Sequence, residues 1–185
     1  MSDKRILILA TARSGSTRLM EWISYELGIT SIDEPFNTNK LHNKEKLKNK
    51  NVVVKELINH TFNIDLRSFI DSFDIVITLR RENTFECAIS LQYSIENHKE
   101  HSTYVIDTKW IDSRNEILNE LVIGIESIGN IVINTESDLA ITYEGIYENK
   151  NDITKVCELL EINNPKYLGM LEKKYKLRNN IQSII

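Results

Sequence analysis

Short runs of Ile, Leu and Val alternate with longer amphipathic segments along this chain, and this alternation most constrains its fold. The run KRILILA, Lys4–Ala10, reads as a buried strand, and apolar side chains follow at helical spacing over residues 17–27. Strands of this kind, each followed by a helix, indicate an α/β fold: a parallel sheet between two layers of helices, with ligands at the carboxyl ends of the strands. The other predicted strands are Asn51–Lys55, Asp74–Leu79, Ile131–Asn134 and Leu139–Tyr143, and the other predicted helices are Asp65–Phe73, Glu82–Asn97, Thr108–Ser127, Asp152–Leu160 and Pro165–Lys174.

Length and charge limit what the chain can be. Its 185 residues show no linker or internal repeat, so we expect a single domain over residues 1–185. The net charge of −4 gives no overall attraction to nucleic acid or to an anionic membrane, so any anion site must be a local concentration of positive charge. No segment reads as a signal peptide or a membrane span, which predicts a cytoplasmic protein with both cysteines reduced.

A turn of small residues, ARSGST, separates the first predicted strand from its helix. Gly15 lets the backbone approach a ligand closely, and the N–H groups at the start of the helix point toward that ligand. Ser14, Ser16 and Thr17 add hydroxyl groups that can bind an anion or cap the helix. A capped turn alone does not explain Arg13, whose charge lies at a helix end that repels cations. The turn therefore predicts an anion site between Arg13 and the helix.

This turn is P-loop-like but departs from the phosphate loop of nucleoside triphosphatases. That loop reads G-x-x-x-x-G-K-[ST], and its Lys and its Ser or Thr bind the outer phosphates and magnesium. Here the first Gly and the Lys are missing, and the third predicted strand ends in Leu79-Arg80-Arg81, where a magnesium-binding carboxylate is expected. Both departures argue against ATP with Mg²⁺, and we expect no metal site.

The stretch ATARSGSTRLMEWIS resembles the 5′-phosphosulfate-binding loop of the sulfotransferases that use 3′-phosphoadenosine 5′-phosphosulfate (PAPS). It is most similar to the branch with Arg-Ser-Gly-[Ser/Thr]-Thr, which includes bacterial carbohydrate and tyrosylprotein sulfotransferases. The resemblance implies that Arg13 stabilises the charge on the departing phosphate. The donor-binding residues that it implies in this loop are Arg13, Ser14, Gly15, Ser16, Thr17 and Arg18.

A second segment, DIVITLRRENTFECAISLQYS, resembles the 3′-phosphate-binding segment of the same family, in which a strand ends in Arg and the next helix carries a Ser. Arg81 and Ser90 match those positions, and Arg80 is the alternative because adjacent strand residues point to opposite faces. Guanidinium donors and a hydroxyl group suit a phosphate monoester. Without the resemblance, the arginines could be a solvated strand end and Ser90 a residue of the helix surface.

Sulfuryl transfer needs a base near the acceptor and positive charge near the sulfur. Glu34, which follows the first predicted helix, matches a Glu that serves as the base in the Arg-type branch; a surface carboxylate is the alternative. Lys55 ends the second predicted strand, where a basic residue in the family lies near the sulfuryl group; a solvated lysine is the alternative. His60 is a reserve base, and Arg178 matches a basic tail segment that reaches the 3′-phosphate.

Taken as a whole, the resemblance implies a sulfotransferase that moves the sulfuryl group of PAPS to a hydroxyl or amine acceptor by in-line displacement. The acceptor can be a small molecule, a carbohydrate or a peptide, and the sequence indicates neither its identity nor the oligomeric state. Two alternatives stay open: a P-loop kinase or nucleotide hydrolase with a degenerate loop, and a nucleotide-binding protein without catalysis.

Overall fold

Five parallel strands form one sheet in the computed structural model, which describes residues 4–97, 106 and 108–172. The strand order is β2-β3-β1-β4-β5, and every neighbouring pair is parallel. The sheet confirms the predicted α/β class with a parallel sheet flanked by helices. The strands are β1 Arg5–Ala10, β2 Thr30–Asp33, β3 Val52–Leu57, β4 Ile75–Arg80 and β5 Leu139–Thr142.

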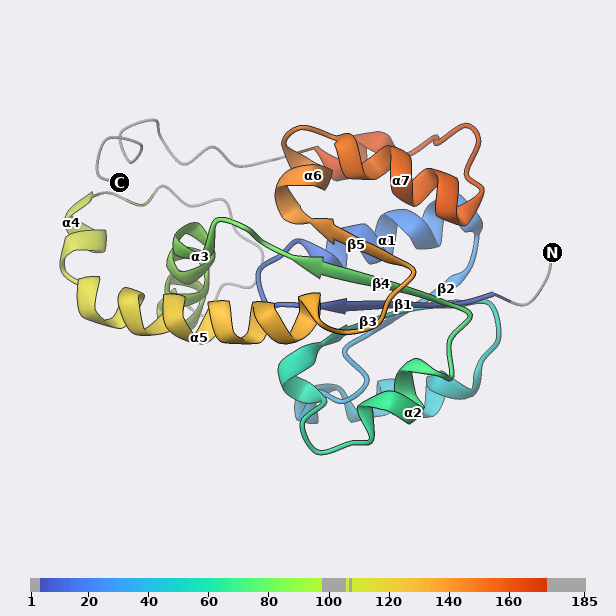
Figure 1. Ribbon diagram of the computed structural model, residues 1–185, viewed down its shortest axis with the longest axis horizontal. Coiled ribbons are helices and arrows are strands. Elements are labelled where there is room, and N and C mark those ends of the chain that lie inside the picture. Colours follow the sequence, from blue (N-terminus) through green and yellow to red (C-terminus); the bar gives the residue numbers. More distant parts are fainter. Residues whose placement is uncertain (1–3, 98–105, 107, 173–185) are drawn as a thin grey trace.

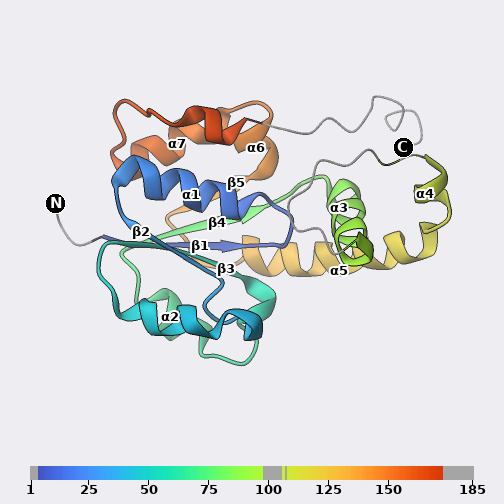
Figure 2. The same cartoon turned by 180° about the vertical axis from the view of Figure 1, so that it is seen from behind.

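Helices lie on both faces of the sheet, and a further group extends past the carboxyl ends of the strands (Figures 1 and 2). One face is covered by α1 Ser16–Leu27, α6 Tyr143–Tyr147, α7 Asn151–Leu160 and the 3-10 helix η3 Leu168–Leu171. The other face carries α2 Leu66–Ile70, the 3-10 helices η1 Thr38–Lys48 and η2 Ile58–His60, and the end of α5 Asn115–Ile133. The rest of α5 extends beyond the sheet with α3 Thr84–Asn97 and α4 Thr108–Asp112.

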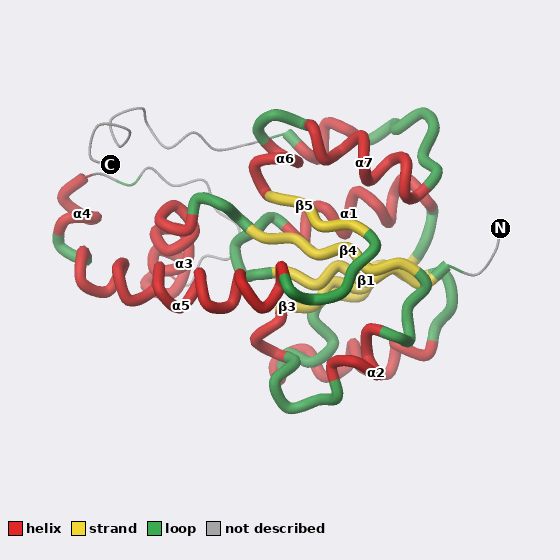
Figure 3. The backbone as a smooth tube through the Cα atoms, in the orientation of Figure 1, coloured by secondary structure: helices red, strands yellow, loops and turns green. Residues whose placement is uncertain are grey.

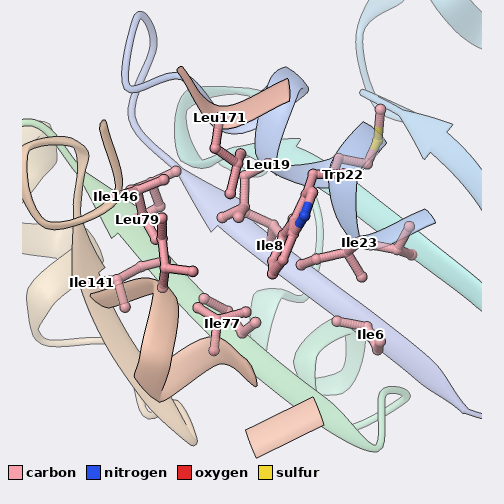
Figure 4. Close-up of a cluster of buried hydrophobic side chains, with 14 of the residues drawn as sticks. Ile6, Ile8, Leu19, Trp22, Ile23, Ile77, Leu79, Ile141, Ile146 and Leu171 are labelled. Carbon is pink, nitrogen blue, oxygen red and sulfur yellow. The ribbon is translucent and has the colours of Figure 1, made fainter. Parts of the chain in front are cut away.

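Alternation along β1 divides the core between the two faces of the sheet. Ile6 and Ile8 pack on the α1 face, where Trp22 and Ile23 cover them (Figure 4). Leu7 belongs to the opposite cluster, which contains α2 and the end of α5. A strand buried on both faces must be apolar at every position, which is why KRILILA is readable as a strand.

Helices α3, α4 and the first part of α5 lie beyond the end of the sheet (Figure 3). A third apolar cluster joins these helices. Cys87 of α3, Ile111 of α4 and Leu118 of α5 are all buried in it. Helices α3 and α5 therefore pack against each other as well as against the strand ends. In the described part of the chain, no helix is long and apolar enough to cross a membrane.

Two secondary-structure predictions near α5 are wrong. Ile131–Asn134 is not a strand, because α5 continues to Ile133 and Val132 packs against the sheet one helical heptad after Ile125. The predicted helix Thr108–Ser127 is two helices, with a break between Asp112 and Asn115.

Two further differences concern the edges of the fold. The prediction missed β2, an edge strand in which only Ile32 is buried, so that it lacks the apolar run of the central strands. Within the described residues, the predicted helix Pro165–Lys174 is limited to the short 3-10 helix η3.

Candidate functional site

The loop between β1 and α1 has the backbone shape of an anion site. Arg13 and Gly15 both have left-handed backbone angles, with φ of 59° and 79°. Alternation of this kind turns successive N–H groups toward one concavity. Gly15 is the N-cap of α1, and no side chain caps the helix there. The first N–H groups of α1 therefore lack the side-chain acceptor that usually satisfies them.

Tyr147 of α6 fixes the position of Gly15. Its hydroxyl group donates a hydrogen bond to the Gly15 carbonyl oxygen at 2.7 Å. Burial raises the pKa of Tyr147 far above its ordinary value, so the phenol stays protonated and remains a donor. A Cβ atom at Gly15 would lie 2.5 Å from Tyr147 Cε2, so the site requires glycine both for its backbone angle and for this contact. Sequence reasoning assigned Tyr147 no role.

The hydroxyl-bearing residues of the loop differ in how deeply they are buried. Ser14 is fully buried, and its Oγ donates to the Thr11 carbonyl oxygen at 2.7 Å. Ser16 is buried at the start of α1, whereas Thr17 is half-buried. Arg18 points elsewhere, because its Nη1 donates to the Glu172 carbonyl oxygen at 3.0 Å. The structure thus gives Ser14 a part in holding the loop itself.

Arg13 and Ser90, which the sequence placed in separate phosphate sites, are in direct contact. Arg13 Nε donates to Ser90 Oγ at 3.0 Å. One turn earlier on α3, Cys87 Sγ donates to the Ala12 carbonyl oxygen at 3.2 Å. Helix α3 is therefore attached to the first loop at two points, and the two segments that were predicted to bind the nucleotide lie side by side.

The two arginines after β4 have different surroundings. The Arg81 side chain is only 9% exposed, contacts the Glu86 carboxylate, and lies over the Tyr143 ring with 4.3 Å from Cζ to the ring centroid. Its Nε is 3.9 Å from Glu144 Oε1. The Arg80 side chain is 37% exposed, and its nearest carboxylate oxygen, on Glu82, is 3.7 Å away. Carboxylates thus already balance the charge of Arg81.

Glu34 directly follows β2 and meets Lys55, which lies two residues before the end of β3. The ammonium group of Lys55 is bonded to the Glu34 carboxylate and lies 2.9 Å from Asp33 Oδ1. Lys40 of η1 binds the same two carboxylates, at 2.5 Å from Asp33 Oδ2 and 3.4 Å from Glu34 Oε2. Two carboxylates and two ammonium groups therefore alternate in one network. The sequence had indicated neither the part of Lys40 nor the pairing of Lys55 with Glu34.

This network holds Glu34 in its charged form. Burial alone would raise the pKa of Glu34, but the charge and hydrogen bond of Lys55, with Asn37 and Lys40, lower the pKa from 4.5 to about 2. For Lys40, burial opposes the charge, and Asp33 and Glu34 outweigh it and raise its pKa. Glu34 also has a left-handed backbone, with φ of 47°. An ionised carboxylate at the end of a strand can accept a proton, although its low pKa makes it a weak base while Lys55 remains bound.

Glu56 supports the same turn from the opposite face of the sheet. It is fully buried, and its carboxylate accepts hydrogen bonds from Phe36 N at 2.8 Å and Leu57 N at 2.9 Å. His60 Nδ1 lies 2.9 Å from Glu56 Oε1. Burial raises the pKa of Glu56. His60, the reserve base, is therefore in contact with Glu56. The sequence had not singled out Glu56.

Arg178, implied by the resemblance as a 3′-phosphate ligand, lies outside the described residues. Among the residues that are described, no group of three or more His, Cys, Asp or Glu side chains is arranged to hold a metal ion.

Comparison with known proteins defines the fold of this chain. No protein-family model matches the sequence, and no curated protein matches it either. Among solved structures, mouse sulfotransferase SULT7A1 complexed with PAP matches 92% of this chain with a TM-score of 0.60 and 16% identity, although the match spans 63% of that structure. The shikimate kinase of Bacteroides thetaiotaomicron matches 86% of this chain and 99% of its own, with a TM-score of 0.57 and 13% identity. The shikimate kinase of Aquifex aeolicus has a TM-score of 0.52 and 14% identity over 85% of this chain and 96% of its own. The chain therefore shares with these structures a P-loop-like α/β fold, in which helices flank a parallel sheet.

Proposed function

We propose that this chain is a sulfotransferase that transfers the sulfuryl group of PAPS to a hydroxyl or amine acceptor. The observation that carries the proposal is the hydrogen bond between Arg13 and Ser90, because it joins the two segments that the sequence assigns to the two ends of one nucleotide. The uncapped start of α1 and the left-handed backbone of Gly15 fit an anionic group at the loop. The positive charge of Arg13 at the same place favours such an anion further.

Different residues of the chain bind the two ends of PAPS. PAPS supplies the sulfuryl group and the phosphate that leaves. The N–H groups at the start of α1 orient the phosphosulfate, and Arg13 balances the negative charge that grows on the departing phosphate. Ser90 and the donors of Arg81 that Glu86 and Glu144 leave free face the 3′-phosphate.

Glu34 accepts the proton that the acceptor loses. The carboxylate is ionised at neutral pH, but Lys55 keeps its proton affinity low. When Lys55 donates instead to an oxygen of the transferring group, the proton affinity of Glu34 rises and Lys55 adds positive charge near the sulfur. The acceptor is a small molecule, a carbohydrate or a peptide.

A kinase or nucleotide hydrolase is the second candidate. It is favoured by the match to shikimate kinases over nearly their whole length. Against it stand the missing loop lysine and the two arginines at the end of β4, where a magnesium-binding carboxylate is expected. A third candidate, a nucleotide-binding protein without catalysis, differs from the first only in turnover.

Thermal shift and calorimetry separate the candidates. We expect 3′-phosphoadenosine 5′-phosphate (PAP) to raise Tm and ATP with Mg²⁺ to leave it unchanged; the reverse result would establish the kinase or hydrolase alternative. Incubation with PAPS and mixed acceptors should then give a sulfated product with the wild type and with Glu45→Gln, an exposed control, but not with Glu34→Gln. Tight PAP binding with no product from any acceptor would favour the non-catalytic alternative.

A further inference from the structure

The turn that carries Glu34 has a strained backbone that several hydrogen bonds hold in place. Glu34 has a φ of 47°, a left-handed conformation that is strained for a residue with a Cβ atom. Its N–H donates to the Lys55 carbonyl oxygen at 2.7 Å, and its own carbonyl oxygen accepts from Asn37 N at 3.1 Å, which closes a four-residue turn over residues 34–37. Strain of this kind persists only where surrounding contacts fix it, so the contacts of this turn show which residues position Glu34.

Glu56 binds the middle of this turn from the other face of the sheet. Alternation along β3 places Glu56 with Val54 on the α2 face, and Lys55 on the α1 face. Glu56 Oε2 accepts a hydrogen bond from Phe36 N at 2.8 Å. The turn is therefore fixed on the α2 face, while the Glu34 carboxylate extends to Lys55.

The chemistry of Glu56 suits this task better than that of a neutral side chain. Its second oxygen, Oε1, accepts from Leu57 N at 2.9 Å and lies 2.9 Å from His60 Nδ1. Each carboxyl oxygen of Glu56 thus accepts a backbone N–H, whereas the amide group of Gln has only one acceptor oxygen. Burial of a carboxyl group is costly unless it is hydrogen-bonded, and here its two oxygens join the turn after β2 to the end of β3.

We propose that Glu56 is a positioning residue for Glu34. Its hydrogen bond to Phe36 N holds the turn over residues 34–37 in the conformation that directs the Glu34 carboxylate toward Lys55 and the acceptor. The inference rests on the proposed function, in which Glu34 is the base. Glu56 is fully buried, so it acts through the turn and not by contact with the acceptor. A base must lie within hydrogen-bond reach of the proton that it removes, so a displacement of about 1 Å is enough to lower turnover.

Three variants separate positioning from stability. Glu56→Met removes both acceptor oxygens and keeps the space filled, and Glu56→Gln keeps one of the two oxygens. The matched control is Glu26→Met, because Glu26 also accepts from two backbone N–H groups, those of Lys166 at 3.0 Å and Tyr167 at 2.6 Å. A ring N–H, Trp22 Nε1, lies 3.1 Å from the same carboxylate. Glu26 is in the last turn of α1, at the end of the helix away from the first loop.

Amide hydrogen exchange tests the positioning without any reaction. In Glu56→Met, the amides of Phe36 and Asn37 should exchange about tenfold faster than in the wild type, the size of one hydrogen bond. The increase should be smaller in Glu56→Gln. Each rate is compared with that of the Val54 amide in the same variant, because a general loss of stability speeds exchange in the core as well. In Glu26→Met the two turn amides should keep their wild-type rates relative to Val54.

Turnover tests whether this position matters to the reaction. At saturating PAPS with the mixed acceptors, product formation should fall about 10- to 100-fold in Glu56→Met and by less in Glu56→Gln. The PAPS concentration for half-maximal rate and the affinity for PAP should stay within about twofold of wild type, because the donor contacts are unchanged. Glu26→Met should keep the wild-type rate. If Glu56→Met does not fold, the same comparisons are made between Glu56→Gln and Glu26→Gln.

Three results would overturn the proposal. Unchanged exchange at Phe36 and Asn37 in Glu56→Met would show that Glu56 does not hold the turn. Faster exchange with wild-type turnover would show that Glu34 does not depend on the turn. An equal fall in turnover in Glu26→Met would assign the effect to lost stability. If the wild type itself gives no product, the proposed function fails, and exchange at Asn37 still decides whether Glu56 holds the turn.

Discussion

Lys55 and Glu34 form a buried ion pair that joins β3 to the end of β2. The Lys55 side chain is only 3% exposed, so its ammonium group depends on Glu34 and Asp33 for charge balance. Under the proposed function, Glu34 of the same pair is the base, so one contact would affect both the stability of the turn and the proposed chemistry.

Removing Lys55 leaves two carboxylates close together with only Lys40 between them. We expect Lys55→Met to lower the free energy of unfolding by about 3–5 kcal/mol, because breaking a buried pair leaves an uncompensated charge. Urea denaturation measures the loss. The matched control is Lys4→Met, which breaks the exposed pair with Glu161 and should cost no more than about 1 kcal/mol. Equal losses in the two variants would show that the Lys55 pair is not buried as described.

The pH dependence of stability follows from the lowered pKa of Glu34. The folded pKa of about 2 lies below the ordinary value of 4.5, so the stabilisation is present above the ordinary value and is lost as the pH falls toward 2. Between about pH 5 and pH 3, the wild type should lose more unfolding free energy than Glu34→Gln, with a difference in slope of up to about 1.4 kcal/mol per pH unit. In Lys55→Met the burial of Glu34 is no longer opposed by that ammonium group, so this part of the pH dependence should flatten. Identical pH profiles of wild type and Glu34→Gln would contradict the assignment.

The sequence predicted the buried strands better than the edge of the sheet. Central strands such as β1 are apolar at every position, a pattern typical of a strand covered on both faces. The edge strand β2 buries only Ile32, so four residues with one core position give no periodic signal. The end of α5 was misread for the opposite reason: a short β-branched run also fits a buried helix, and only its contact with the sheet decides between them.

Sequence reasoning singled out residues whose chemistry is visible and missed the contacts that depend on the fold. Arg13 and Ser90 were both singled out. Their contact, however, depends on how α3 packs against the first loop, which the sequence does not show. Lys40 lies in a polar run with several lysines, and nothing local distinguishes the one that reaches Glu34. The carboxylates that balance Arg81 belong to α3 and α6 and could not be assigned to it from spacing alone.

Gly15 should be less replaceable than Gly28, although both have positive φ, 79° and 63°. At Gly28 a Cβ atom meets nothing within 4 Å, so Gly28→Ala should cost only the left-handed backbone penalty of about 1 kcal/mol. At Gly15 the same substitution also meets Tyr147, so Gly15→Ala should cost at least about 1 kcal/mol more and should lower PAP affinity. Chemical denaturation and calorimetry measure the two effects. Equal destabilisation by both substitutions would remove the role assigned to Tyr147.

The contact between Arg13 and Ser90 makes the sharpest prediction about the nucleotide. Arg13→Ala should weaken PAP binding about 10- to 100-fold, the range for a hydrogen bond to a charged group. Ser90→Ala should weaken it about fivefold, and the double variant should show less than the product of the two effects because the residues are in contact. Arg67→Ala, an exposed arginine on α2 paired with Asp71 and Glu136, is the control and should leave PAP affinity unchanged. Wild-type PAP affinity in Arg13→Ala would show that Arg13 does not bind the nucleotide, and would leave the uncapped start of α1 as the anion-binding feature of the loop. That feature does not distinguish a sulfotransferase from a kinase, and the proposed function would then lose its support.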